Sequence, residues 1–187
     1  MVKTIKISAH NHTTNSDGLF KPEQLLNILN KHYDVVAITD HRFLTKPKYI
    51  PPDLMFFYGV EYYLSHLGFE VLGLCPDLNN PTLASCEVAW VCHPKYIHCD
   101  LNRVIKFIQS VENVYGCEIY NQAEYQFDGW EYDWFNSYDN MNFYAVDDLH
   151  VMQNLKTSWM EMEVDSVDKH TVLENLKSGD FWIKTKH

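Results

Sequence analysis

The chain has 187 residues, 46% of them hydrophobic and 21% charged, which fits one globular domain over residues 1–187 and excludes a disordered polymer. A formal net charge of −10 excludes the basic stripe that neutralises duplex nucleic acid, so we expect no such partner. Five cysteines without a C-x-x-C pair, and no run of about 18 apolar residues, favour a reducing cytoplasmic setting and no membrane partner.

The predicted elements alternate along the chain between strands and helices. Residues 4–8 alternate apolar and polar side chains as a strand does, a helix begins near Pro22, and residues 34–38 form a buried strand. Further strands are expected over residues 54–60, 69–74, 88–92, 115–120 and 143–146. Asp100 is expected to cap a helix over residues 101–111, and a last helix over residues 167–177 ends near Gly179. This order predicts an α/β barrel with parallel strands.

Residues 124–140 are unusually rich in aromatic side chains, which stand among acidic ones. One interpretation is a loop and helix folded against the barrel, because aromatic residues dominate cores. The other is a wall that stacks on a base or another aromatic substrate. The sequence leaves both open.

Side chains of the kind that bind metals follow the predicted strands. His10 and His12 are two apart in extended backbone, so they project to the same side and offer two donors to one centre. Imidazole nitrogen mixed with carboxylate oxygen suits zinc, manganese or iron, whereas calcium needs nearly all-oxygen ligation. The set in chain order is His10, His12, Asp17, Asp40, His41, Glu61, His93, Asp147, Asp148 and His150. So many ligands imply more than one ion; the alternative is a set of hydrogen-bonded surface histidines.

The same residues fall into short motifs that carry a family resemblance. They are His10-Asn11-His12 with Asp17, Ile38-Thr39-Asp40-His41, Cys92-His93-Pro94, and Asp147-Asp148-Leu149-His150, together with Glu61 in Gly59-Val60-Glu61. In this order they resemble the four motifs and the bridging glutamate of the PHP (polymerase and histidinol phosphatase) superfamily of metallohydrolases. Trp159 and residues 173–181 resemble its closing segment, so the similarity spans nearly the whole chain.

The resemblance implies a distorted seven-stranded (β/α) barrel with two or three divalent ions, manganese, zinc or iron, at the C-terminal ends of its strands. By this analogy His10, His12, Glu61 and Asp148 hold the first metal. Glu61 bridges to a second metal that His93 also holds, and Asp17, His41 and His150 hold a third. The family usually has a histidine where this chain has Glu70, so either Glu70 or the nearby His66 is expected to complete the second site.

The predicted function is a metal-dependent phosphatase or phosphodiesterase that uses a metal-activated water on a small phosphorylated metabolite or nucleotide. His41, His93 or Asp40 is expected to protonate the leaving group, although for Asp40 we favour a role in orienting a ligand histidine. Arg42 and Lys95 follow two of the motifs and are candidates to contact the substrate phosphate.

Two other functions stay open. One is a 5′ to 3′ exonuclease on short single-stranded oligonucleotides, which the aromatic segment would favour and the acidic balance disfavours. The other is a degenerate barrel that binds a nucleotide or a partner protein without turnover, which only the position of Glu70 encourages.

Overall fold

A computed structural model describes residues 2–94, 100–122, 124–125, 133, 137–138 and 141–186. Lys95, one of the predicted phosphate contacts, lies outside these residues. So does most of the aromatic segment, and the two interpretations of it stay predictions.

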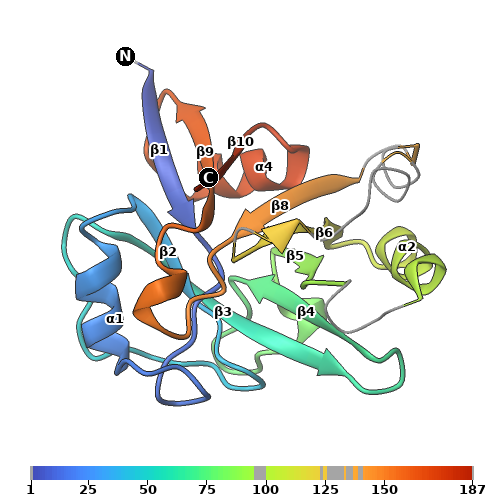
Figure 1. The fold of residues 1–187 in the computed structure, drawn as a ribbon, viewed down its shortest axis with the longest axis horizontal. Helices are drawn as coiled ribbons and strands as arrows, with labels where there is room; N and C mark the ends of the chain where they lie inside the picture. Colours follow the sequence, from blue (N-terminus) through green and yellow to red (C-terminus); the bar gives the residue numbers. More distant parts are fainter. Residues whose placement is uncertain are drawn as a thin grey trace.

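Ten strands in the described residues form one mixed sheet that curves into a nearly closed barrel (Figure 1). They are β1 (Lys3–Ser8), β2 (Val35–Ile38), β3 (Met55–Leu64), β4 (Phe69–Leu74), β5 (Val88–Val91), β6 (Val114–Asn121), β7 (Glu124–Tyr125), β8 (Asn142–Val146), β9 (Ser158–Val164) and β10 (Trp182–Thr185). The order is β10-β9-β1-β2-β3-β4-β5-β6-β7, and β8 pairs with β6. The α/β barrel is therefore confirmed in outline.

The structure departs from the all-parallel barrel that the order of elements predicted, and its ten strands in the described residues exceed the seven that the family resemblance implies. The pairs β1/β2, β2/β3, β5/β6 and β6/β8 are parallel, whereas β4 runs antiparallel to both β3 and β5. The prediction also missed β9 and β10, which add antiparallel strands beside β1. The sequence of β9, Ser-Trp-Met-Glu-Met-Glu-Val, carries the alternation of a half-buried strand, so a signal for it was present.

Three helices in the described residues lie outside the sheet: α1 (Pro22–Leu29), α2 (Leu101–Ser110) and α4 (Lys169–Ser178). Two short 3-10 turns span Leu83–Ser85 and Met152–Asn154. The side chain of Asp100 accepts a hydrogen bond from the backbone N–H of Asn102, so the predicted cap of α2 is confirmed. Gly179 ends α4 in the left-handed conformation, with φ at 78°, as predicted.

Apolar side chains fill the interior of the barrel and leave the functional groups at one end of it. Trp90 on β5 stacks on Tyr144 on β8, with ring centroids 4.2 Å apart, and both are fully buried. Helix α4 contributes Val172 and Leu176 to the same cluster. Because the interior is packed, polar groups at the strand ends rest on a rigid base. None of the helices in the described residues is long and apolar enough to cross a membrane.

Two glycines with the same backbone conformation test the C-cap of α4. Gly68 and Gly179 both have φ at 78°, but a Cβ on Gly179 would lie 2.6 Å from Oδ1 of Asn142, whereas one on Gly68 meets nothing within 4 Å. Asn142 cannot easily move, because its Nδ2 donates to the carbonyl oxygens of Leu176 and Lys177. Replacement by alanine at either position strains the backbone by about 1–2 kcal/mol.

We therefore expect Gly179→Ala to lower the free energy of unfolding by more than Gly68→Ala does, as measured by urea denaturation. Equal losses in the two variants would show that the Asn142 contact does not constrain the helix end.

Candidate metal centre

The first group of functional side chains comes from the segment after β1, from β3 and from the loop after β8. His10 and His12 present their Nε2 atoms to the same two carboxylate oxygens. Oε2 of Glu61 lies 3.2 Å from His10 and 3.3 Å from His12, and Oδ1 of Asp148 lies 3.4 Å and 3.3 Å from them. These four buried atoms have no hydrogen-bond partner among the described residues. Four donors thus converge on one point.

The spacing of these four atoms fits one metal ion. Zinc bonds to imidazole nitrogen and carboxylate oxygen are about 2.0–2.2 Å long, which places neighbouring ligands of a tetrahedron about 3.4 Å apart. Two neutral imidazoles and two carboxylates also match the donor preference of zinc, manganese and iron. The residues therefore fit the ion that the family resemblance implies.

Strained backbone at three strand ends helps to aim the side chains. Arg42 after β2, His93 after β5 and Asp148 after β8 all have positive φ, at 56°, 20° and 45°. Such conformations are uncommon for residues other than glycine and persist where the surroundings impose them, often at functional sites. Asn11 braces the end of β1, because its Nδ2 donates to the carbonyl oxygens of Ser8 and Ala37.

A second group extends from Glu61 toward β5 and β4. The second carboxylate oxygen of Glu61, Oε1, lies 3.2 Å from Nε2 of His93. Glu70 on β4 also approaches this group, with Oε2 at 3.8 Å from the same nitrogen and Oε1 at 3.5 Å from Nδ1 of His41. Cys92 is close by, but burial, reinforced by Glu61, raises the pKa of its thiol well above the ordinary value. A raised pKa favours the neutral thiol, which is buried among its neighbours.

A third group surrounds Asp17 in the loop after β1. Its Oδ2 lies 3.4 Å from Nε2 of His41, and its Oδ1 lies 3.3 Å from Nε2 of His150. Burial opposes ionisation of this carboxyl, but His12, His150 and His41 outweigh it and lower the pKa of Asp17. The structure thus brings together the three residues that the resemblance assigns to a third ion.

Glu118 in the middle of β6 is a site residue that the sequence analysis missed. Its Oε1 lies 2.8 Å from Nδ1 of His10 and accepts from Nε1 of Trp90, and its Oε2 accepts from the backbone N–H of His93 and from Nδ2 of Asn121. A carboxylate at Nδ1 holds the proton there and turns the Nε2 lone pair toward the centre. The available signal was an acidic residue inside an otherwise buried strand.

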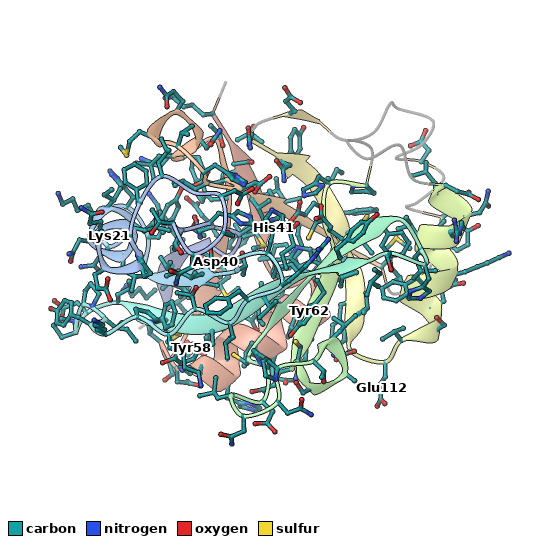
Figure 2. All side chains as sticks on the ribbon, turned by 90° about the horizontal axis from the view of Figure 1, so that it is seen from below. Lys21, Asp40, His41, Tyr58, Tyr62 and Glu112 are labelled. Carbon is teal, nitrogen blue, oxygen red and sulfur yellow. The ribbon has the colours of Figure 1, made fainter. Side chains whose placement is uncertain are left out.

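Asp40 is not among the described residues that line the cavity, and its contacts fit the supporting role that the sequence analysis favours. It is fully buried, and its two oxygens accept hydrogen bonds from the Thr13 N–H at 2.6 Å, from Ser16 Oγ at 2.7 Å, and from the hydroxyls of Thr13 and Thr45. With both oxygens engaged, Asp40 holds the loop between His12 and Asp17. Figure 2 shows it next to His41, beside β3.

Two other predicted residues, Arg42 and His66, are not among the described residues that line the cavity. Arg42 is exposed, and its guanidinium lies over the ring of Tyr63, 5.1 Å from the centroid. His66 is exposed in the turn after β3 and joins none of the potential metal-binding groups in the described residues, whereas Glu70 joins one. Between the two alternatives for the second site, the structure places only Glu70 near His93.

The three groups share one cavity of about 450 Å³ at the strand ends. Its lining in the described residues consists of Asp17, His41, Glu61, Glu70, His93, Asn121, Gln122, Glu124, Asp148 and His150. This lining contains five carboxylates and, among the described residues, no lysine or arginine. An anionic substrate would therefore be repelled unless cations occupied the cavity.

No protein-family model and no curated protein matches the chain. Solved structures do match. A two-domain protein from Bacteroides vulgatus ATCC 8482, described as containing a predicted PHP-like metal-dependent phosphoesterase, is 12% identical, with a TM-score of 0.76 over 98% of this chain and 65% of that one. The chain therefore spans less than two thirds of that protein.

Two further structures have the same fold. PsfC from Pseudomonas syringae PB-5123 is 13% identical, with a TM-score of 0.68 over 98% of this chain and 92% of that one. The lesion-specific endonuclease PfuEndoQ from Pyrococcus furiosus is 12% identical, with a TM-score of 0.66 over 97% of this chain and 58% of that one. The chain therefore shares its fold with these structures, and its strand ends carry a cluster of histidines and carboxylates. The resemblance to the PHP superfamily is confirmed at the level of the fold.

Replacing Glu118 tests how the cluster is held. Glu118→Gln keeps the size of the side chain but removes the charge that fixes the tautomer of His10, so we expect metal affinity to fall by about 10–100-fold. Isothermal titration with Mn²⁺ measures this, and Glu112→Gln, an exposed change, is the control. Unchanged affinity in Glu118→Gln would show that His10 does not depend on this contact.

The metal-free protein is expected to lose stability as the pH rises from 6.5 to about 9. Burial opposes protonation, but Asp148 and Glu61 outweigh it and raise the pKa of His12 from 6.5 to about 9. Glu61 and Glu118 do the same for His93, also to about 9. The folded state then binds more protons than the unfolded state in this window. The contribution of these two histidines to the free energy of unfolding is complete below pH 6.5 and is lost as the pH rises through 9.

Urea denaturation in EDTA across this pH range measures the effect. Excess Mn²⁺ is expected to abolish or reverse the fall, because the ions replace the protons on these histidines. Rising stability in EDTA over the same range would contradict the assignment.

Proposed function

We propose that the chain is a metal-dependent phosphoester hydrolase that acts on a small phosphomonoester or nucleotide. The observation that carries the proposal is the set of four buried, unpaired donor atoms of His10, His12, Glu61 and Asp148, spaced 3.2–3.4 Å apart across each histidine–carboxylate pair. Burying such groups without a partner costs several kcal/mol per charge, so their retention favours a bound cation.

The residues divide into positions for three ions. His10, His12, Glu61 and Asp148 would hold the first; Glu61 and His93 contribute to the second; Asp17, His41 and His150 would hold the third. Divalent ions bound there would supply an activated water and neutralise the phosphoryl oxygens. The affinity for a phosphorylated substrate would depend strictly on those ions, because the cavity is lined by carboxylates and no described lining residue is a lysine or arginine.

Other side chains of the protein orient the metal ligands and supply candidate proton donors. Glu118 fixes the ring of His10, and Asp40 fixes the loop that carries Asp17. Because Asp40 is excluded from the cavity, His41 and His93, which line it, are the remaining candidates to donate a proton to the leaving group.

A planar surface beside the cavity favours a nucleotide among phosphoesters. Tyr63 is two residues from Glu61 on β3 and directly opposite Glu70 on β4, so it shares their face of the sheet. It is 43% exposed, and the guanidinium of Arg42 lies over its ring. Tyrosine and arginine stack on bases, so we propose that this pair contacts the base of a nucleotide substrate.

A short single-stranded oligonucleotide is the second candidate substrate, because the same stacking surface would accept a terminal base. The two differ in salt dependence. Turnover that falls steeply with salt indicates several backbone contacts, whereas weak dependence indicates a single phosphate.

The direct test is a phosphoester panel with Mn²⁺, Zn²⁺ or Fe²⁺, containing mononucleotides, aliphatic phosphomonoesters and short oligonucleotides. We expect His10→Ala and Asp148→Ala to lower kcat/KM by more than about 100-fold, beyond the range for residues that only support ligands. His170→Ala and Asp165→Ala remove the same groups from the exposed surface and serve as matched controls.

Equal cleavage by the wild type and both cavity variants would show that the activity arises elsewhere. A wild-type protein that binds the ions tightly but cleaves nothing in the panel would instead favour the degenerate binding module.

A further inference from the structure

Two carboxylates in the cavity face the same pair of imidazole nitrogens. The oxygens of Glu61 lie 3.0 Å from Nδ1 of His41 and 3.2 Å from Nε2 of His93. The oxygens of Glu70 lie 3.5 Å and 3.8 Å from the same two nitrogens. Glu61 is fully buried, and the side chain of Glu70 is 19% exposed. Like charges placed side by side out of water repel each other unless a cation lies between them.

His41 cannot serve both sides of the cavity as a ligand. A neutral imidazole has one lone pair, so if Nε2 of His41 binds the third ion beside Asp17, its Nδ1 carries the proton and faces the carboxylates of Glu61 and Glu70 without binding a metal. The donors that remain for the second position are therefore one oxygen of Glu61, one oxygen of Glu70 and Nε2 of His93.

The three positions consequently differ in their donors. The second has two carboxylate oxygens for one imidazole nitrogen. The first has two of each, from His10, His12, Glu61 and Asp148, and the third has two nitrogens and one carboxylate, from His41, His150 and Asp17. Carboxylate oxygen suits Mn²⁺ and other hard ions, whereas imidazole suits Zn²⁺. The second position is thus the most oxygen-rich of the three.

We propose that Glu70 makes the second position the one that retains Mn²⁺ most strongly against Zn²⁺, so that the chain holds a mixed set of ions when both are present. This inference rests on the proposed metal-dependent function. It assigns to Glu70 the selection of the metal, a role separate from cleavage of the substrate.

Zinc displacement from the Mn²⁺-loaded chain tests the inference without measuring activity. Released Mn²⁺ gives a strong solution EPR signal, and metal analysis gives the content of the protein. In the wild type we expect one Mn²⁺ per chain to leave only at about tenfold higher Zn²⁺ than the others. In Glu70→His all the Mn²⁺ is expected to leave in one phase, with the same total number of ions.

Two further variants isolate the ligand from its charge. Glu70→Gln is expected to lose one ion per chain, whereas Glu124→Gln, which removes a carboxylate from the same cavity lining, is expected to behave as the wild type. A single phase in the wild type, or a late phase that persists in Glu70→His, would overturn the inference while leaving the metal centre intact. A wild-type chain that binds no Mn²⁺ at all would instead overturn the proposed function.

Discussion

The structure of this end of the barrel depends on the burial of two carboxylates, Glu61 and Asp148, against the imidazoles of His10 and His12. A carboxylate removed from water costs several kcal/mol unless a positive partner compensates it. Without a metal, the histidines can compensate only by holding protons, and the pKa of His12 accordingly rises to about 9. A divalent ion supplies the same charge to four donors at once and leaves the imidazoles neutral. The cluster is therefore stabilised when it binds a cation and destabilised when it does not.

The barrel makes this arrangement possible by bringing distant parts of the chain to one edge. The parallel strands β1, β2, β5 and β8 end beside the cavity, and each is followed by histidine or carboxylate ligands. Trp90 and Tyr144 stack in the core beneath the cavity. Glu118 on β6 accepts a hydrogen bond from Trp90 and contacts the imidazole of His10, so it connects the core to the cluster. A polar network of this kind positions ligands because every member is satisfied except the atoms that face the centre.

Much of this was predictable from the sequence, because the ligands follow strands whose hydrophobic pattern is clear. The spacing of His10 and His12, and the end of α4 at Gly179, needed only local rules. Glu118 was not predictable in this way, since its partners are far away in the chain, His10 by 108 residues. The partners of Asp40 were hidden for the same reason: the hydroxyls of Thr13 and Thr45 that engage it are visible only in the folded structure. Strand β9 was missed although its alternation was present.

The location of bound ions tests the central claim most directly. Crystals of the wild-type chain grown with Mn²⁺ and measured by anomalous scattering would place each ion without reference to activity. The account predicts a peak between His10, His12, Glu61 and Asp148, at bonding distance from all four, with further peaks beside His93 and Asp17. No anomalous peak among these side chains at saturating Mn²⁺ would contradict it.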